Sequence, residues 1–163
     1  MIFIKLWYRF TGFLLKILYK ILYSNSIRWG KSLHFRKGLQ LTVEQGGAIV
    51  IGDNVFFNNY CAVHALEKIE IGSETIFGEN VRIYDHNHRF SDTEHAIKEQ
   101  GYSVAPVTIG EHCWIGSNVT LLKGAHIGAN CVIGSGCVIS KQIPANTVVR
   151  LEQNITMEEV RHA

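Results

Sequence analysis

The chain has very little proline, and its beginning has no acidic residue. Only two of the 163 residues are proline, and residues 1–38 hold eight Lys or Arg without a single Asp or Glu. Residues 39–163 hold eight basic and fourteen acidic residues. Because the body is acidic and only its N-terminal arm is basic, this pattern argues against a general nucleic-acid-binding protein. The 47% apolar content is enough for one domain with a continuous core.

Paired cysteines of the CxxC type are also missing. The four cysteines are Cys61, Cys113, Cys131 and Cys137. Without a CxxC pair, they give no sign of a zinc-binding or redox motif. We therefore predict reduced thiols in the core of a cytosolic protein rather than disulfides or metal ligands.

The first 23 residues lack an uncharged run long enough to cross a membrane. The longest such run is residues 10–15, far below the length of a spanning helix, and no signal-peptide cleavage site follows. At 100° per residue, the charges Lys5, Arg9, Lys16 and Lys20 fall within about 60° of one helix face. We expect an amphipathic helix and a basic connector over residues 1–32.

Two interpretations of this helix remain open. In the first, residues 1–23 lie in the plane of an anionic membrane, with aromatic residues at the headgroups. In the second, the helix packs on its own domain or on a neighbouring subunit. The width of the apolar surface favours the membrane.

A six-residue repeat dominates the rest of the chain. An aliphatic residue recurs at Ile109, Ile115, Leu121, Ile127, Ile133 and Ile139. Four positions after each comes a small or β-branched residue, at Cys113, Val119, Ala125, Cys131, Cys137 and Ile143. This period is typical of a parallel β-helix in which three hexads make one coil and the aliphatic residues point inward. Glycine follows four of the aliphatic residues, and we expect it there because the corner needs unusual backbone angles.

The same pattern extends the all-β domain to about five coils over residues 33–150. Residues 151–163 form a C-terminal tail whose structure the sequence does not decide. The repeat stops at residues 85–106, a polar segment that begins Asp85-His86-Asn87-His88. A long excursion from a rigid solenoid is usually a binding or catalytic loop.

Several motifs in this order are specific to a known family. They are the segment 85–88, Pro106 to Gly110, Trp114 to Ser117 and Val138 to Pro144. Over roughly residues 48–145 the chain resembles the left-handed β-helix (hexapeptide-repeat) acetyltransferases. It is most similar to the maltose/galactoside acetyltransferase-like branch, which includes capsule, lipopolysaccharide and exopolysaccharide O-acetyltransferases. The resemblance implies a homotrimer that binds acetyl-CoA between the β-helices of adjacent subunits.

The resemblance places the catalytic histidine at His86. A neutral imidazole can take the proton of a sugar hydroxyl as that hydroxyl attacks a thioester. His88 is the competing candidate, as the base itself or as a ligand of the acceptor sugar. Asp85, Asp92 and Glu94 are each candidates to orient the imidazole.

Further site residues follow from the same resemblance. A sugar contact falls on Asn58, although Asn58 could instead be a corner residue in a left-handed conformation. His64 lies nearby and either faces the same cleft or is a structural histidine, and Asp85 is a further candidate to bind the substrate. The acetyl-CoA contacts fall on Ser117, Ser135, Ser140 and Lys141, with Trp114 shaping the pocket beside the base.

The expected activity is transfer of an acetyl group to a sugar hydroxyl of a bacterial surface polysaccharide or its precursor. The expected place is the cytoplasmic face of the membrane, where lipid-linked glycans are assembled. An N-acyltransferase acting on an amino sugar is the main alternative. A β-helix carbonic anhydrase would need zinc on His64, His86 and His88, which lack ligand-type spacing, so no metal is expected.

Overall fold

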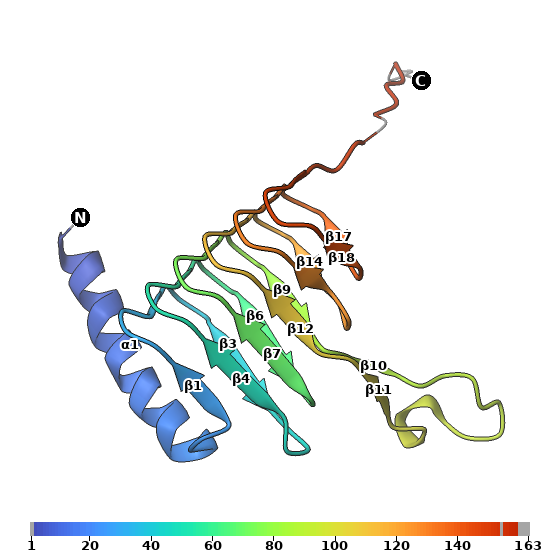
Figure 1. Ribbon diagram of the computed structural model, residues 1–163, viewed down its shortest axis with the longest axis horizontal. Coiled ribbons are helices and arrows are strands. Elements are labelled where there is room, and N and C mark those ends of the chain that lie inside the picture. Colours follow the sequence, from blue (N-terminus) through green and yellow to red (C-terminus); the bar gives the residue numbers. More distant parts are fainter. Residues whose placement is uncertain (1, 154, 160–163) are drawn as a thin grey trace.

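The chain forms a left-handed parallel β-helix with a helix at one end and a hairpin extending from its middle (Figure 1). The computed structural model describes residues 2–153 and 155–159. Sheet A consists of β1 (Ile27–Trp29), β4 (Ala48–Ile51), β7 (Lys68–Ile71), β12 (Val107–Ile109), β15 (His126–Ile127) and β18 (Gln142–Ile143). Sheet B consists of β2 (His34–Phe35), β5 (Phe56–Phe57), β8 (Ile76–Phe77), β13 (Trp114–Ile115), β16 (Val132–Ile133) and β19 (Val148–Val149). Sheet C consists of β3 (Gln40–Val43), β6 (Ala62–Ala65), β9 (Arg82–Tyr84), β14 (Thr120–Leu121) and β17 (Val138–Ile139).

The prediction that the aliphatic residues of the six-residue repeat point into the core is confirmed. All six aliphatic positions from Ile109 to Ile139 are at most 5% exposed, and the small residues between them are buried as well. Equivalent positions stack in register, as Ile71, Ile109 and Ile127 do along sheet A. The core is therefore a column of aliphatic side chains, widened by the stacked rings of Phe57 and Phe77.

The stack has about six turns against the five expected, and its first strand, β1, lies before the predicted start of the domain and pairs with β4. The sequence gives no clear hexad at Ile27, yet this side chain is buried in the same core. The repeat thus begins six residues before the predicted start of the domain.

The reason expected for the glycines after the aliphatic positions is wrong. Gly110 does not have a positive φ; a Cβ there would lie 2.5 Å from the backbone nitrogen of Ala129 in the next coil. The left-handed residue of this corner comes two positions later, at His112 (φ 56°). Glycine at position 110 therefore permits close stacking of coils rather than an unusual backbone angle.

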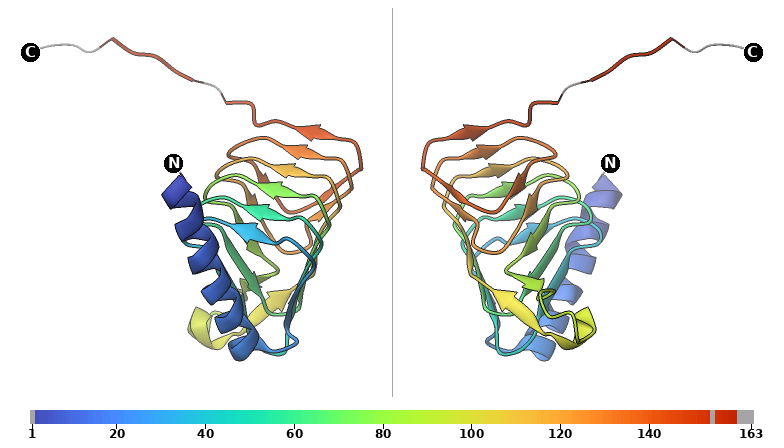
Figure 2. Two further views of the ribbon diagram at one scale, coloured as in Figure 1. Left: turned by 90° about the vertical axis from the view of Figure 1, so that its left-hand side faces the viewer. Right: turned by 90° about the vertical axis from the view of Figure 1, so that its right-hand side faces the viewer.

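Helix α1 (Ile2–Tyr23) lies across the N-terminal end of the stack, next to β1 (Figures 1 and 2). Its inner face packs on the core through Leu15, Tyr19 and Tyr23. The Tyr19 hydroxyl donates to Leu39 O (3.0 Å) and accepts from Leu41 N (3.2 Å), so it satisfies backbone groups on the free edge of β3. The helix thus covers an end that would otherwise expose unpaired strand edges.

The opposite end carries no such cover in the described residues. Residues 151–153 and 155–159 of the predicted tail are exposed and have no regular secondary structure, while residues 154 and 160–163 lie outside the described part. The four cysteines are buried and unpaired, as predicted. Among the described residues, no helix is both long enough and apolar enough to span a membrane.

Candidate functional site

Two of the three corners of the prism carry the predicted site residues. The C–A corner joins sheet C to sheet A at residues 44–47, 66–67, 85–106, 122–125 and 140–141. The B–C corner joins sheet B to sheet C at residues 36–39, 58–61, 78–81, 116–119 and 134–137. The excursion at residues 85–106 leaves the C–A corner as the antiparallel hairpin β10 (His86–His88) and β11 (Tyr102–Val104), with a 3₁₀ turn η1 (Ile97–Glu99) in its outer part (Figure 1).

Asp85 anchors the base of this hairpin. Its carboxylate is fully buried and accepts hydrogen bonds from the backbone N–H groups of Leu66 (2.9 Å) and Glu67 (2.8 Å) in the coil below. The same carboxylate lies 3.0 Å from Nδ1 of His86. Asp85 was predicted to bind substrate and was also, with Asp92 and Glu94, a candidate to orient the imidazole; its contacts with the Leu66 and Glu67 backbone and with His86 fit the second role.

The other two candidates for orienting His86 have different partners. Asp92 lies in the outer part of the hairpin and pairs with Nδ1 of His95 at 2.9 Å. Two hydrogen-bonded neighbours, the backbone N–H of Glu94 and the His95 ring, lower the pKa of the Asp92 carboxyl. Glu94 gives its backbone N–H to that carboxylate at 2.8 Å. Sequence spacing alone could not show which of the three acids contacts His86, because that contact depends on how the segment 85–106 folds.

An alternating row of imidazole and phenol rings runs along the C–A corner. His64 stacks on Tyr84 with 5.4 Å between ring centroids, and Tyr84 meets the His86 ring edge-on at 6.1 Å. Tyr102 then lies between the two hairpin histidines, 5.4 Å from His86 and 4.5 Å from His88. The row brings His64, His86 and His88 together at the C–A corner.

The two tyrosines of this row were missed by sequence reasoning. Tyr84 is the last residue of β9, and its outward direction follows from the strand alternation. Tyr102 is far from His88 in sequence, and only the register of the hairpin places the two opposite each other. Alternation could have suggested Tyr84, but no local signal fixes the register that brings Tyr102 to the site.

His86 and His88 differ in how firmly they are held. They lie two positions apart on β10 and therefore project to the same face. The His86 side chain is 19% exposed and is tethered through Nδ1, while its Nε2 has no hydrogen-bond partner among the described residues. His88 is exposed at the outer end of the row.

Burial also affects the third histidine of the row. It lowers the pKa of the His64 imidazole, and the nearby charge of His86 acts in the same direction. His64 therefore favours its neutral form next to the hairpin histidines.

Asn58 lies on the other corner. Its side-chain oxygen accepts from Arg36 Nη1 at 3.3 Å and from the backbone N–H of Asn59 at 2.9 Å. The left-handed residue of this turn is Tyr60 (φ 61°), so the alternative explanation of Asn58 as a left-handed corner residue is wrong.

The predicted acetyl-CoA residues divide between the same two corners. Ser117 and Ser135 lie on the B–C corner in successive coils, with exposed Trp114 on the sheet B side of it. Ser140 and Lys141 lie on the C–A corner, above the hairpin, and both are exposed. Within one chain, sheet C therefore separates the histidine row from Ser117, Ser135 and Asn58.

His64, His86 and His88 do not form a metal site within the chain. Among the described residues, no group of three His, Cys, Asp or Glu side chains could hold a metal ion. The geometry instead holds one imidazole by a buried carboxylate, which suits proton transfer.

The chain matches known proteins over this region. The family model for the bacterial transferase hexapeptide (six repeats) matches residues 106–141. A protein of Escherichia coli K12, WbbJ, provisionally named a lipopolysaccharide biosynthesis O-acetyl transferase, is 34% identical over 133 residues, which cover 76% of this chain and 67% of that protein. The chain spans half or less of the length of several other relatives that it matches.

Solved structures agree with the sequence matches. A maltose O-acetyltransferase from Clostridium difficile 630 superposes with a TM-score of 0.65 at 30% identity, covering 86% of this chain and 79% of that one. A hexapeptide-repeat acetyltransferase from Vibrio cholerae, complexed with acetyl-CoA, gives a TM-score of 0.67 at 25% identity, covering 82% and 69%.

The family model and the solved structures agree with the parallel β-helix of hexads described above. The chain belongs to the hexapeptide-repeat acetyltransferase family. The matched relatives are named acetyltransferases, and the Vibrio cholerae neighbour was crystallised with acetyl-CoA.

Proposed function

We propose that the protein transfers an acetyl group from acetyl-CoA to a hydroxyl of a bacterial surface polysaccharide or its precursor. The observation that carries this proposal is the His86 imidazole, held through Nδ1 by the buried Asp85 with Nε2 free. The name of the related WbbJ protein supports a glycan acceptor.

His86 acts as the general base. Its Nε2 accepts the proton of the sugar hydroxyl while the sugar oxygen forms a bond to the thioester carbonyl carbon. The carbon–sulfur bond then breaks, and the CoA sulfur receives the proton from the imidazolium. Asp85 fixes the tautomer and ring direction, and this arrangement contributes about 10²- to 10⁴-fold in rate.

The catalytic unit is a homotrimer. The histidine row and the residues Asn58, Ser117 and Ser135 lie on different corners of one prism. When three prisms stand side by side, the C–A corner of one subunit can face the B–C corner of the next. Acetyl-CoA occupies the crevice between them, with Trp114 beside the base and Lys141 available to a CoA phosphate.

The acceptor places the enzyme at the cytoplasmic face of the membrane, where lipid-linked glycans are built. The acid-free N-terminal arm supports this location, because anionic lipid attracts Lys and Arg.

The test is release of CoA thiol from acetyl-CoA with a panel of glycan and amino-sugar acceptors. His86→Ala should lower kcat by about 10²-fold or more, whereas His95→Ala, in the outer hairpin, should keep wild-type turnover. A full loss in His88→Ala with an active His86→Ala would move the base to His88. The proposal fails if no acceptor hydroxyl is acetylated and the protein does not bind CoA in calorimetry.

A further inference from the structure

Helix α1 has two apolar faces, and the solenoid occupies only one of them. Its inner face carries Leu15, Tyr19 and Tyr23, which pack on the core. Its outer face carries Phe3, Trp7, Phe10, Phe13, Leu14, Ile17, Leu18, Ile21 and Leu22, which are between 43% and 85% exposed. A contiguous apolar face of this size marks an interaction surface.

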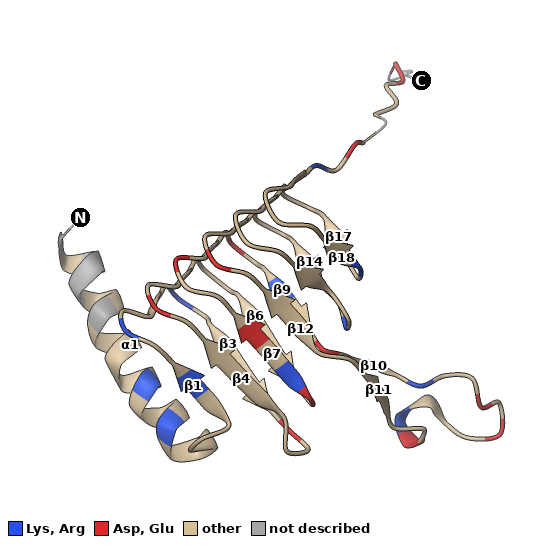
Figure 3. Cartoon of the chain, viewed as in Figure 1, with Lys and Arg blue, Asp and Glu red and all other residues tan. Residues whose placement is uncertain are grey.

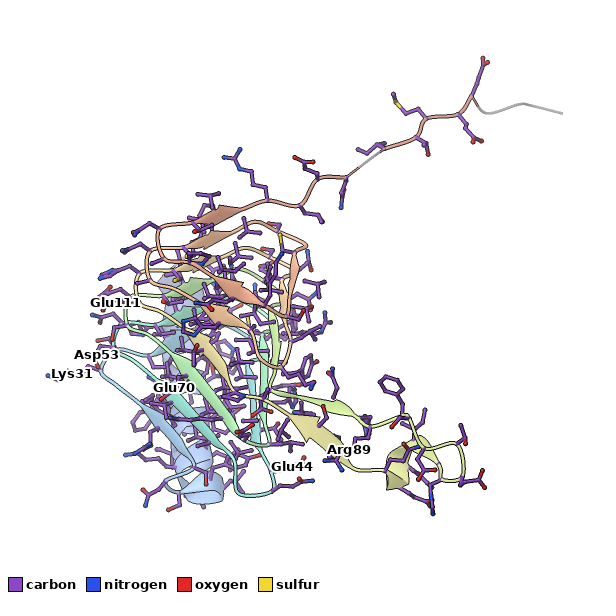
Figure 4. The ribbon with its side chains drawn as sticks, turned by 45° about the vertical axis from the view of Figure 1, so that its right-hand side comes forward. Lys31, Glu44, Asp53, Glu70, Arg89 and Glu111 are labelled. Atoms are coloured by element: carbon purple, nitrogen blue, oxygen red, sulfur yellow. The ribbon has the colours of Figure 1, made fainter. Side chains whose placement is uncertain are left out.

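The charges around this face are of one sign. Lys20 on the helix, Arg28 on β1 and the corner residues Lys31, Arg36 and Lys37 are all exposed, and the first acidic residue of the chain is Glu44. Figure 3 shows Lys and Arg on the helix and first coil, with acids in later coils. Figure 4 shows the same change along one edge, where Lys31 is followed by Asp53 and then Glu111.

A groove continues the outer face onto the solenoid. It has a volume of about 930 Å³ and is bordered by aromatic residues of α1, including Trp7 and Phe10, and by Phe35, Arg36 and Lys37 of the first coil. Apolar side chains beside two cations suit the boundary where acyl chains meet phosphate headgroups.

The charge pattern decides which partner fits. A second copy of the chain, facing this end, would bring the same cations together without an acid to neutralise them. That contact would be repulsive. An anionic bilayer neutralises the cations and buries the apolar face at once.

We infer that the outer face of α1 docks the protein onto an anionic lipid bilayer, with the solenoid axis standing along the membrane normal. Apolar side chains enter the interface, and the ring of cations contacts lipid phosphates. The proposed trimer, on which this step rests, places three such helices in one plane, so the attachments reinforce one another.

This orientation sets the height of the active site above the bilayer. The hairpin leaves the stack two to three coils from the N-terminal end, a distance of ~10–15 Å along the solenoid axis at about 4.8 Å per coil. The thickness of the helix adds ~10 Å to this distance. The imidazole therefore works ~20–25 Å from the lipid surface. A membrane-anchored acceptor must then be a glycan long enough to present its hydroxyl at that height.

The first test is co-sedimentation of the full-length protein with vesicles. Binding to phosphatidylglycerol/phosphatidylcholine vesicles should exceed binding to phosphatidylcholine alone and should weaken with salt. Phe13→Gln/Ile21→Gln/Leu22→Gln should weaken it at least tenfold, with turnover of a soluble acceptor unchanged. Ile155→Gln/Met157→Gln, equally exposed at the other end of the stack, should bind like wild type. Absence of vesicle binding, or a doubled mass in light scattering that the triple variant abolishes, overturns the inference.

The second test uses acceptors tethered to vesicle lipids by spacers of increasing length. Acetylation should begin once the spacer spans ~20 Å. Equal acetylation at every length would overturn the orientation while leaving the proposed activity intact. Failure of the free acceptor as well would instead count against the proposed function.

Discussion

The carboxylate of Asp85 lies 3.0 Å from Nδ1 of His86 and also accepts the backbone N–H groups of Leu66 and Glu67. One buried side chain therefore binds the backbone at the corner of one coil. The same side chain orients the imidazole on the hairpin that extends from the following coil. The hairpin is thus tied to the rigid solenoid at Asp85, the residue before His86.

Asp85→Asn should lower kcat about tenfold to a hundredfold, because an amide no longer holds the imidazolium and its tautomer. It should also cost about 1–3 kcal/mol in the free energy of unfolding, since the new NH₂ group can face the Leu66 or Glu67 N–H. Steady-state kinetics and urea unfolding measure both effects. Asp92→Asn, which changes the Asp–His pair of the outer hairpin, should leave turnover near wild type. Equal losses in the two variants would contradict the role given to Asp85.

The protein should lose stability in mild acid through His64. Burial lowers the pKa of this imidazole from its usual 6.5, so the unfolded chain binds more protons between the two pKa values. The free energy of unfolding should therefore fall as the pH drops below about 6.5 and level off below the folded pKa.

Thermal unfolding at pH 7.5 and 5.5 measures this dependence. His64→Phe keeps the ring stacked on Tyr84 and should reduce the difference in Tm between the two pH values. An unchanged difference would assign the acid sensitivity to other groups.

Tyr19→Phe should cost about 1–2 kcal/mol of stability. The change leaves Leu39 O and Leu41 N without their partner while the aromatic ring still packs on the core. Tyr23→Phe, on the same face of α1, is the matched control in guanidinium unfolding. If the two variants have the same midpoint, the Tyr19 hydroxyl does not hold the cap in place.

Gly110→Ala should cost about 1–3 kcal/mol, because its methyl group would press on the backbone of the next coil. His112→Asn should be neutral or slightly stabilising, since Asn tolerates the left-handed angles that His112 adopts. Differential scanning calorimetry of the two variants separates close packing from backbone angle. A Gly110→Ala variant as stable as the wild type would contradict the close stacking of coils at this position.

Much of the fold could be predicted because the same six-residue pattern occurs in many successive hexads. Each hexad has an aliphatic residue at the position that points into the core. Ile115, Leu121 and Ile133 are accordingly fully buried. Strand β1 was missed because Ile27 and Trp29 lie in one short strand without a preceding hexad. Its place depends on pairing with β4, which is a long-range contact.

The site was less accessible to sequence reasoning. The motif around residue 86 led to the hairpin and to both histidines, but the partner of His86 could not be chosen among three acids. The neighbouring Tyr102 depends on a hairpin register that no local pattern encodes. The resemblance named residues on both corners, yet only the strand order shows that Asn58 and His86 lie apart in one prism.

The most direct test of the shared crevice is complementation between two inactive variants. His86→Ala/His88→Ala disables the C–A corner, and Trp114→Ala with Asn58→Ala disables the B–C corner. Unfolding the two variants together and reassembling them in equal amounts should restore about a quarter of the wild-type thiol release, because random trimers then contain interfaces with two intact corners. If the reassembled mixture is no more active than the two separate variants, each active site belongs to a single chain and the account is contradicted.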